Sequence, residues 1–394
     1  MAEDESPEAR NAGAENADAQ KAGEETLARL LARRILMDGP ISVGAFMAEA
    51  LGHPRLGYYI RQDPFGSGGD FTTAPEISQM FGELVGLWCV DSWARLGGPG
   101  PFHLVELGPG RGTLMADAVR AAAVLPLFRD NAIVHLVETS PALRERQRRT
   151  LQPILGDAIQ WHDRLEDVPD GPTILIANEF FDALPIRQVQ KTNHGWFERL
   201  VDLAPDSTES DPRFRFVLEA FGSSGSRLVP DPLRDAPDGS VVEVSPASQA
   251  VARLIGARLA AAPGAALVID YGYAQGPAVG DTLQALRRHA FAPVLEAPGE
   301  ADLTAHVDFA AIAAAARQGG ARSFGPVEQG EWLTRLGIHQ RASSLAGKAT
   351  PAQAKDIQSA LERLIDPAQM GRLFKLVALA TPGAFTDASP PAGF

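Results

Sequence analysis

The order of apolar and polar positions predicts an α/β chain. Short apolar runs, typical of strands that are buried on both faces, occur at 103–107, 132–137, 158–161, 173–177, 265–270, 323–327 and 374–380. Helix-compatible segments lie between several of them. Strands that alternate with helices form a mostly parallel sheet with helices on its faces. We therefore expect a Rossmann-like sheet of seven strands.

Further elements are predicted before the first strand. Leucine and isoleucine at helical spacing predict a helix over residues 25–38, and Ser42 is suited to cap a second helix. A glycine-rich loop follows at 57–70. Thr73 and Glu76 then fit a capping box, in which the threonine caps the helix and the glutamate reaches back to the cap. These residues predict a cap of helices and loop in front of the sheet.

The chain divides by composition into three parts. Residues 1–22 are acidic, contain almost no bulky apolar side chains, and are expected to be disordered. Residues 23–100 hold the helical cap and its loop, and 101–394 hold the sheet domain. Between the fourth and fifth predicted strands, 185–245 alternates apolar and polar positions and predicts a β-rich insertion. Insertions at strand ends commonly wall off a substrate site.

Composition restricts the class of protein. The 394 residues carry a formal charge of −13, which argues against a nucleic-acid partner because a phosphate track needs a basic face. The only cysteine, Cys89, excludes a disulfide framework, and no histidine–aspartate spacing indicates a metal site. No apolar run is long enough to cross a bilayer, and the acidic start does not resemble a mitochondrial transit peptide. We expect a cytoplasmic bacterial protein, and the sequence leaves open whether it forms a homodimer.

The end of the first predicted strand carries the most informative chemistry. There, Glu106 is followed by Gly108, Gly110 and Gly112, at every second position. Glycines adopt positive φ and let a ligand approach the bare backbone, while the next helix points free N–H groups at it. Dinucleotide folds place their third glycine one residue later, where this chain has Thr113. The spacing instead favours S-adenosylmethionine over the alternative, a nicotinamide cofactor of an oxidoreductase.

Acids at the next two strand ends extend this interpretation. Glu138 follows the second strand, where a carboxylate can accept hydrogen bonds from both hydroxyls of a ribose. Asp157 and Asp163 flank the third strand, and either carboxylate is suited to accept from an adenine amino group. His162 is a further candidate there, and the sequence does not decide among the three.

Four stretches resemble the MidA-type methyltransferases, bacterial relatives of the mitochondrial arginine methyltransferase that assists assembly of respiratory complex I. The stretches are Gly57–Glu83 (with GDFTTAPEISQMFGE), Leu104–Thr113 (VELGPGRGT), Ile176–Pro185 (IANEFFDALP) and Asp302–Phe309 (DLTAHVDF). The resemblance implies the class I methyltransferase fold, S-adenosylmethionine as cofactor, and a protein substrate, possibly a complex I subunit. It also places Thr73 and Glu76 against the ligand. A cofactor-binding assembly factor without turnover is the alternative from another class.

The fourth strand end carries the catalytic hypothesis. In the fold implied by the resemblance it faces the transferred methyl group, and here it holds Asn178, Glu179 and Asp182. A guanidinium acceptor presents paired N–H donors that suit a carboxylate fork, so we expect Glu179 to grip it. Asp182 or Asp270 is the candidate second acid, and each has a structural alternative as a cap or loop-ordering group. Glu106 is expected to order the turn or meet the α-ammonium of the ligand.

Overall fold

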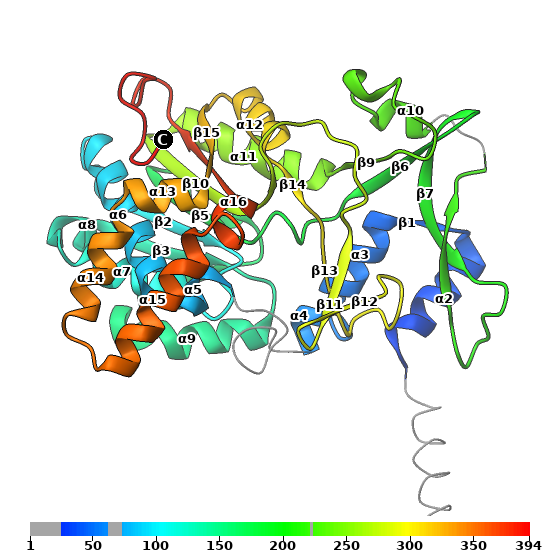
Figure 1. Cartoon of the computed structure of the whole chain (residues 1–394), viewed down its shortest axis with the longest axis horizontal. Coiled ribbons are helices and arrows are strands. Elements are labelled where there is room, and N and C mark those ends of the chain that lie inside the picture. The colour runs from blue at the N-terminus through cyan, green and yellow to red at the C-terminus, as the bar shows by residue number, and fades with distance from the viewer. Residues whose placement is uncertain (1–24, 62–72, 221–223) are drawn as a thin grey trace, which may run out of the picture.

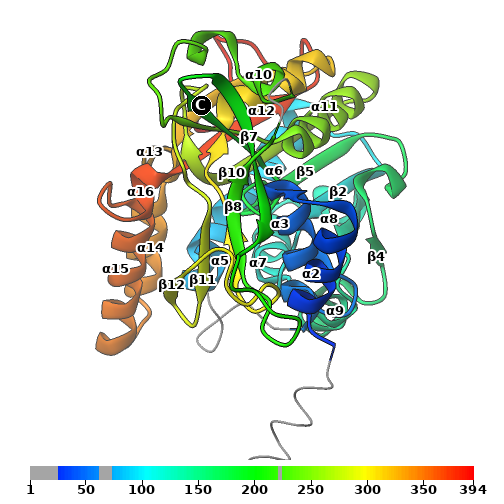
Figure 2. The ribbon, with the colours of Figure 1, turned by 90° about the vertical axis from the view of Figure 1, so that its right-hand side faces the viewer.

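The computed structural model describes residues 25–61, 73–220 and 224–394 (Figure 1). The predicted acidic tail and most of the glycine-rich loop lie outside these residues. The described chain combines a large sheet covered by helices with a second, mostly antiparallel β-region carrying the first helices (Figures 1 and 2).

The large sheet confirms the expected α/β architecture. Its strands follow the order β4-β3-β2-β5-β10-β16-β15, in which the first five are parallel and β16 runs antiparallel to both neighbours. The two-residue β14 also pairs with β10, so the sheet has eight strands rather than the seven expected. The strands are β2 (Phe102–Leu107), β3 (Ala132–Val137), β4 (Ile159–His162), β5 (Thr173–Asn178), β10 (Gly264–Tyr273), β14 (Val307–Asp308), β15 (Arg322–Glu328) and β16 (Phe374–Ala380).

Helices cover both faces of this sheet, as its two-sided apolar strands require. One face packs against α6 (Gln79–Arg95), α7 (Thr113–Ala122), α9 (Pro141–Leu155), α13 (Gln329–Arg335), α14 (Ile338–Ala346) and α15 (Pro351–Ile365). The other face packs against α11 (Pro246–Ala261) and α12 (Phe309–Gln318). Alternate residues of β2 enter the two cores, since Leu104 belongs to the first and Val105 to the second. The remaining short helices are α5 (Ala74–Ile77), α8 (Pro126–Asn131) and α16 (Met370–Leu373).

The insertion forms a second sheet. Its strands β6 (Arg187–Thr192), β7 (Gly195–Leu203), β8 (Phe214–Leu218) and β9 (Val241–Val244) lie inside the predicted range 185–245, together with α10 (Ser224–Leu228). The edge strand β1 (Ile41–Ser42) comes from the N-terminal region and pairs antiparallel with β7. This pairing was not predicted, because a two-residue strand leaves no periodicity in the sequence.

A third small sheet, within residues 284–304, packs against the N-terminal helices. Strands β11 (Gln284–Arg287), β12 (Ala290–Ala292) and β13 (Asp302–Thr304) share one apolar cluster with α2 (Leu27–Asp38), α3 (Val43–Gly52) and α4 (Tyr58–Arg61). The expected cap at Ser42 is confirmed, since its Oγ accepts from Ala45 N at 3.1 Å. This cluster places the N-terminal helices next to residues that lie more than two hundred positions later.

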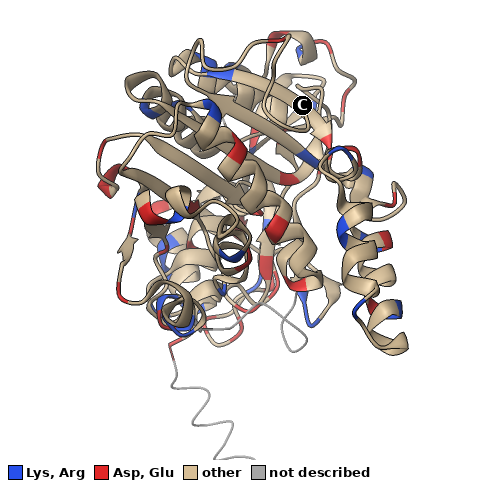
Figure 3. Cartoon of the chain, turned by 90° about the vertical axis from the view of Figure 1, so that its left-hand side faces the viewer, with Lys and Arg blue, Asp and Glu red and all other residues tan. Residues whose placement is uncertain are grey.

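Two surface properties complete the description. Within the described residues, no helix has both the length and the apolar composition needed to cross a bilayer. Figure 3 shows lysine and arginine residues interspersed with aspartate and glutamate residues along the ribbon.

Candidate active site

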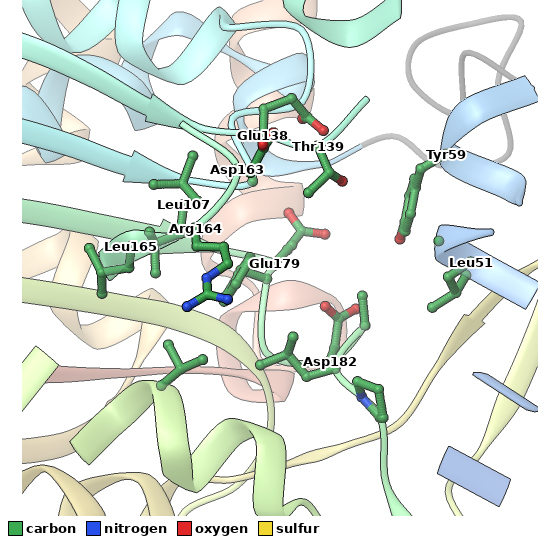
Figure 4. Close-up of a pocket in the computed structure, with 18 of the residues that line it drawn as sticks. Leu51, Tyr59, Leu107, Glu138, Thr139, Asp163, Arg164, Leu165, Glu179 and Asp182 are labelled. Atoms are coloured by element: carbon green, nitrogen blue, oxygen red, sulfur yellow. The ribbon is translucent and has the colours of Figure 1, made fainter. Parts of the chain in front are cut away.

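The main cavity lies at the carboxyl ends of the parallel strands, between the large sheet and the N-terminal helices (Figure 4). Its volume is about 730 Å³. Ligands of open α/β sheets bind at this edge of the sheet. Of the predicted site residues, it is lined by Thr73, Gly108, Gly110, Glu138, Asp163, Glu179 and Asp182.

The glycine turn after β2 has the predicted backbone. Gly108, Gly110 and Gly112 have φ of 59°, 52° and 80°, in the left-handed region that favours glycine. A Cβ on Gly108 would lie 3.0 Å from the Phe180 ring, and one on Gly112 would lie 3.3 Å from Leu151 Cδ1. The turn therefore needs glycine for its conformation and for close packing, and Gly108 and Gly110 line the cavity with backbone.

Glu138 is held at the end of β3 by a buried network. Its carboxylate accepts from Ser140 N at 2.8 Å and from Gln147 Nε2 at 3.1 Å. The same Gln147 nitrogen donates to the carbonyl oxygen of Gly110 at 2.8 Å, and Gln147 Oε1 accepts from Trp161 Nε1 at 2.9 Å. Burial raises the pKa of Glu138, and the donated hydrogen bonds oppose this shift. Gln147 thus connects the glycine turn to the acid. It was not predicted, because it stands in an arginine-rich helix.

The structure places the three adenine candidates at different positions along β4. His162 is the last residue of this strand, and its Nε2 lies 2.9 Å from His135 Nδ1. Asp163 follows β4, lines the cavity, and accepts from Arg144 at 2.6 Å. Asp157 precedes β4, so it stands at the opposite end of that strand, and its carboxylate accepts from Gln152 Nε2 at 3.2 Å. The expectation for Asp157 is corrected accordingly, because ligands bind at the carboxyl ends of the strands. The neighbouring Arg164, which also lines the cavity, was not predicted.

A smaller pocket of about 40 Å³ adjoins the glycine turn, and it contains Glu106 and Glu76. Glu106 is 2 % exposed, and its Oε2 accepts no hydrogen bond from the described residues. Burial raises the pKa of this carboxyl to about 8. A buried carboxyl that lacks a partner is costly, which fits a group that meets a ligand cation.

The predicted capping box at Thr73 and Glu76 is wrong. Thr73 makes no side-chain cap hydrogen bond at the start of α5. Glu76 turns instead toward the glycine loop, where its Oε1 accepts from Thr113 Oγ1 at 2.6 Å and its Oε2 lies 3.8 Å from Arg111 NH1. Of the two roles expected for Glu76, a helix cap or a position against the ligand, its contacts fit the second.

At the end of β5, Glu179 occupies a strained backbone position. Its φ is 49°, which is uncommon for a residue other than glycine and is often found at functional sites. Its Oε1 accepts from Ala74 N at 3.3 Å and from Asn178 Nδ2 at 3.2 Å. Burial and the nearby Asp182 carboxylate raise the pKa of Glu179 to about 7. Asn178 Oδ1 is buried and without a hydrogen-bond partner among the described residues.

Asp182 and Asp270 have different positions. Asp182 lines the cavity, is 6 % exposed, and has its pKa raised to about 6 by burial. Asp270 is fully buried and accepts from the backbone N–H groups of Phe181 at 3.0 Å and Asp182 at 3.2 Å. Asp270 thus orders the turn after β5, and of the two candidates for a second acid only Asp182 lines the cavity beside Glu179.

The motif residues near 302–308 also divide. Asp308 caps α12, since its Oδ1 accepts from Ala311 N at 2.9 Å. The His306 ring packs edge-on against Tyr271 at 5.6 Å. Asp302 lines the cavity and accepts from the Tyr59 hydroxyl at 2.8 Å. Across the parts of the chain described above, no group of three histidine, cysteine or acidic side chains is arranged to hold a metal ion.

Together, the strand order, the glycine turn and the acid after β3 define a class I methyltransferase fold. The chain also matches, over residues 84–327, the model of a family described as "S-adenosyl-L-methionine-dependent methyltransferase". The chain belongs to this family of S-adenosylmethionine-dependent methyltransferases.

Individual relatives agree with this assignment. The chain is 40 % identical over 402 residues to the Drosophila melanogaster protein named "Protein arginine methyltransferase NDUFAF7 homolog, mitochondrial", covering 95 % of this chain and 90 % of the relative. It is 38 % identical over 374 residues to the human protein arginine methyltransferase NDUFAF7, covering 89 % and 82 %. A COG1565 superfamily structure from Burkholderia thailandensis, bound to S-adenosyl-homocysteine, is 31 % identical with a TM-score of 0.76 over 92 % of this chain and 94 % of that one.

The residues present fit S-adenosylmethionine. The positive-φ turn offers bare backbone, Glu106 holds a buried oxygen that lacks a donor, and Glu138 offers a carboxylate to the ribose diol. The cofactor supplies an activated methyl group on a sulfonium. The nicotinamide alternative is thereby set aside.

Proposed function

We propose that this chain is a protein arginine N-methyltransferase. Its relatives named as protein arginine methyltransferases support this substrate class. The acids at the end of β5 support it independently, because a guanidinium is permanently charged and pairs with carboxylates through a planar fork of N–H donors. The single observation that carries the proposal is Glu179, whose strained backbone turns a carboxylate into the cavity beside the glycine turn.

The proposed reaction is an in-line displacement. A guanidinium nitrogen forms a bond to the methyl carbon, the carbon–sulfur bond breaks with its electron pair going to sulfur, and the acceptor nitrogen gives up one proton. Such a transfer depends mainly on alignment. Glu179 holds one edge of the guanidinium and directs the other nitrogen at the methyl carbon. The raised pKa of Glu179, about 7, also suits it to take up the released proton.

Other residues hold the two reactants in place. Asn178 fixes the Glu179 carboxylate through the hydrogen bond between them, and Asp182 adds negative charge next to it. On the cofactor side, Glu138 orients the ribose, and Asp163 is placed for the adenine amino group. Thr73 and Glu76 close the far side of the glycine turn.

The partner and the compartment are further parts of the proposal. The resemblance points to a protein substrate, with a subunit of respiratory complex I or its equivalent as the specific expectation. The eukaryotic relatives are named mitochondrial, whereas the two solved structures named for the COG1565 superfamily come from a bacterium. We propose a cytoplasmic location in a bacterium, which fractionation of the source cells tests.

The test is methylation of a captured partner. The purified chain is used to isolate its binding partner from cells that do not produce this protein, so that the partner is unmethylated. The partner is then incubated with S-adenosylmethionine and either wild-type or Glu179→Gln protein. Mass spectrometry is expected to place new methyl groups on arginine with wild type, and at least about 100-fold fewer with Glu179→Gln, in line with the loss of a charge-assisted clamp. Glu145→Gln, an exposed acid on α9, is the matched control.

Two results contradict the proposal. Methyl groups on another residue type would overturn the arginine assignment. Capture of a partner without any methylation would instead favour the assembly factor without turnover.

A further inference from the structure

We propose that Tyr59 and Asp302 form a second wall of the acceptor site, so that the guanidinium is held between this pair and the carboxylates of Glu179 and Asp182. The inference rests on the proposed arginine methyltransferase function and extends it to residues outside the large parallel sheet.

Tyr59 and Asp302 meet although 243 positions separate them. Tyr59 lies on the short helix α4, and Asp302 is the first residue of β13. The Tyr59 hydroxyl donates to Asp302 Oδ1 at 2.8 Å, and both residues line the main cavity. Figure 4 shows Tyr59 across the cavity from Glu179 and Asp182.

The apolar cluster of the N-terminal helices holds this pair in place. Leu303, beside Asp302, is buried in the cluster with Tyr58, beside Tyr59, and with Leu51 of α3. The Tyr58 and Tyr59 rings pack edge to face at 5.3 Å. The pair is therefore built on packed secondary structure, which keeps a binding group in a defined position.

The acidic side chains near Tyr59 and Asp302 lie around the same part of the cavity. The Asp302 and Asp182 carboxylates both raise the pKa of the Tyr59 hydroxyl, which places both acids near this oxygen. Asp182 in turn raises the pKa of Glu179. Three carboxyl groups from two segments, the turn after β5 and the start of β13, thus surround one part of the cavity. Like charges at this separation repel each other, and a cation between them removes the repulsion.

An unpaired atom shows where a ligand donor is needed. Asp182 is 6 % exposed, and its Oδ1 is buried without a hydrogen bond of normal geometry in the described parts of the chain. The Tyr271 hydroxyl lies close enough to interact with this carboxyl, but it too makes no hydrogen bond of normal geometry there. A buried carboxylate oxygen without a donor is costly, and an N–H group of a ligand satisfies it. Because Asp182 lines the cavity, that donor is expected to come from the cavity side.

The shape of the ligand follows from the two walls. A guanidinium has five N–H donors spread over a plane, so it can reach carboxylates on opposite sides at the same time, whereas a lysine ammonium presents three donors from one point. Next to the acids, the cavity is lined by apolar side chains suited to the methylene stem of arginine: Leu51, Leu184, Val251 and Leu254. The arrangement fits an arginine side chain that enters guanidinium first and lays its methylene stem along this apolar surface.

The test measures binding of an arginine probe to protein saturated with S-adenosylhomocysteine. The probe is N-acetyl-L-arginine N-methylamide, and the matching citrulline derivative is its uncharged isostere. Calorimetry is expected to show that wild type binds the arginine probe and prefers it to the citrulline probe. Asp302→Asn is expected to lower the affinity for the arginine probe by about 10-fold, because it removes a carboxylate charge from the second wall. Tyr59→Phe is expected to lower it by about 3-fold, because it removes the hydroxyl that holds Asp302.

Controls separate a binding role from a structural one. Affinity for S-adenosylhomocysteine is expected to be unchanged in both variants, and Asp302→Glu is expected to recover part of the arginine affinity. Glu300→Gln, an exposed acid two residues from Asp302, is expected to bind both compounds as wild type does.

The outcomes also separate this inference from the proposed function. If wild type prefers the arginine probe and Asp302→Asn binds it equally well, the second wall is refuted and the proposed function stands. If wild type does not distinguish the arginine probe from the citrulline probe, the arginine assignment itself fails.

Discussion

Three histidines on adjacent strands make the stability of the large sheet depend on pH. His135 is fully buried, and its ring lies 2.8 Å from His103 and 2.9 Å from His162, measured between ring nitrogens. His103 Nε2 lies 3.3 Å from the carbonyl oxygen of Asp170, which only accepts hydrogen bonds. The proton therefore sits on Nε2 of all three rings. His162 Nε2 donates to His135 Nδ1, His135 Nε2 donates to His103 Nδ1, and His103 Nε2 donates to the Asp170 carbonyl. Protonation of His135 would break one of its two bonds.

The size of the effect follows from the pKa of His135. Burial and the neighbouring histidines lower it from 6.5 to about 3. Below pH 6.5 the unfolded chain takes up a proton that the folded chain does not, so stability is complete above this pH and falls as the pH drops. His135 alone accounts for a loss of about 2 kcal/mol between pH 7 and pH 5, and at most about 5 kcal/mol by pH 3.

The assay must isolate this histidine from buried acids that act in the opposite direction. The pKa of Glu106 is raised to about 8 and that of Glu179 to about 7, so the folded chain binds more protons at these sites and gains stability as the pH falls. The free energy of unfolding in urea is measured for wild type and His135→Gln at pH 7 and at pH 5. Both proteins contain the buried acids, so the difference between them at each pH cancels the contribution of those acids. The advantage of wild type is expected to shrink by about 2 kcal/mol at pH 5.

His194→Gln is the matched control, because His194 is exposed on the turn between β6 and β7. Its difference from wild type is expected to change much less between the two pH values. An advantage of wild type over His135→Gln that is the same at pH 7 and pH 5 would refute the reasoning.

Four further predictions concern the site. Gly110→Val is expected to abolish S-adenosylmethionine binding in calorimetry, because a branched side chain disfavours its φ of 52° and blocks the backbone surface; unchanged affinity would refute the turn assignment. Glu138→Gln is expected to weaken the same binding by about 10-fold, since a neutral amide replaces the charged acceptor for the ribose, and equal titration curves would exclude this role. The kcat/KM for the arginine substrate is expected to fall below about pH 7, where Glu179 becomes protonated, so a flat profile from pH 6 to 8 argues against the clamp. Asp270→Ala is expected to lower the free energy of unfolding by about 2 kcal/mol, because it leaves the N–H groups of Phe181 and Asp182 unpaired; an unchanged urea midpoint would show that they find other partners.

The parts of the fold that the sequence predicted are those with strong local signals. Buried strands such as β5 and β10 are uninterrupted apolar runs in the sequence. The three alternating glycines after β2 predict a turn with positive φ. The antiparallel insertion was visible because its strands alternate. By contrast, β1 and β14 have two residues each, and their pairing is decided by distant partners.

Where local sequence patterns predicted the wrong role for a site residue, the role depends on contacts with residues distant in the sequence. Thr73 and Glu76 match a capping box, yet Glu76 bonds to Thr113, 37 positions away. Asp157 and Asp163 flank the third predicted strand, but the direction of the chain places only Asp163 at the ligand edge. The contact between Tyr59 and Asp302 depends on a small sheet that no sequence pattern indicated.

The most direct test of the account is a crystal structure of this chain with S-adenosylhomocysteine. In that structure we expect the ribose hydroxyls on the Glu138 carboxylate, the amino-acid group beside Glu106, and the sulfur facing Glu179. A compound bound elsewhere, or a cavity filled by side chains where the glycine turn should meet the ligand, would contradict it.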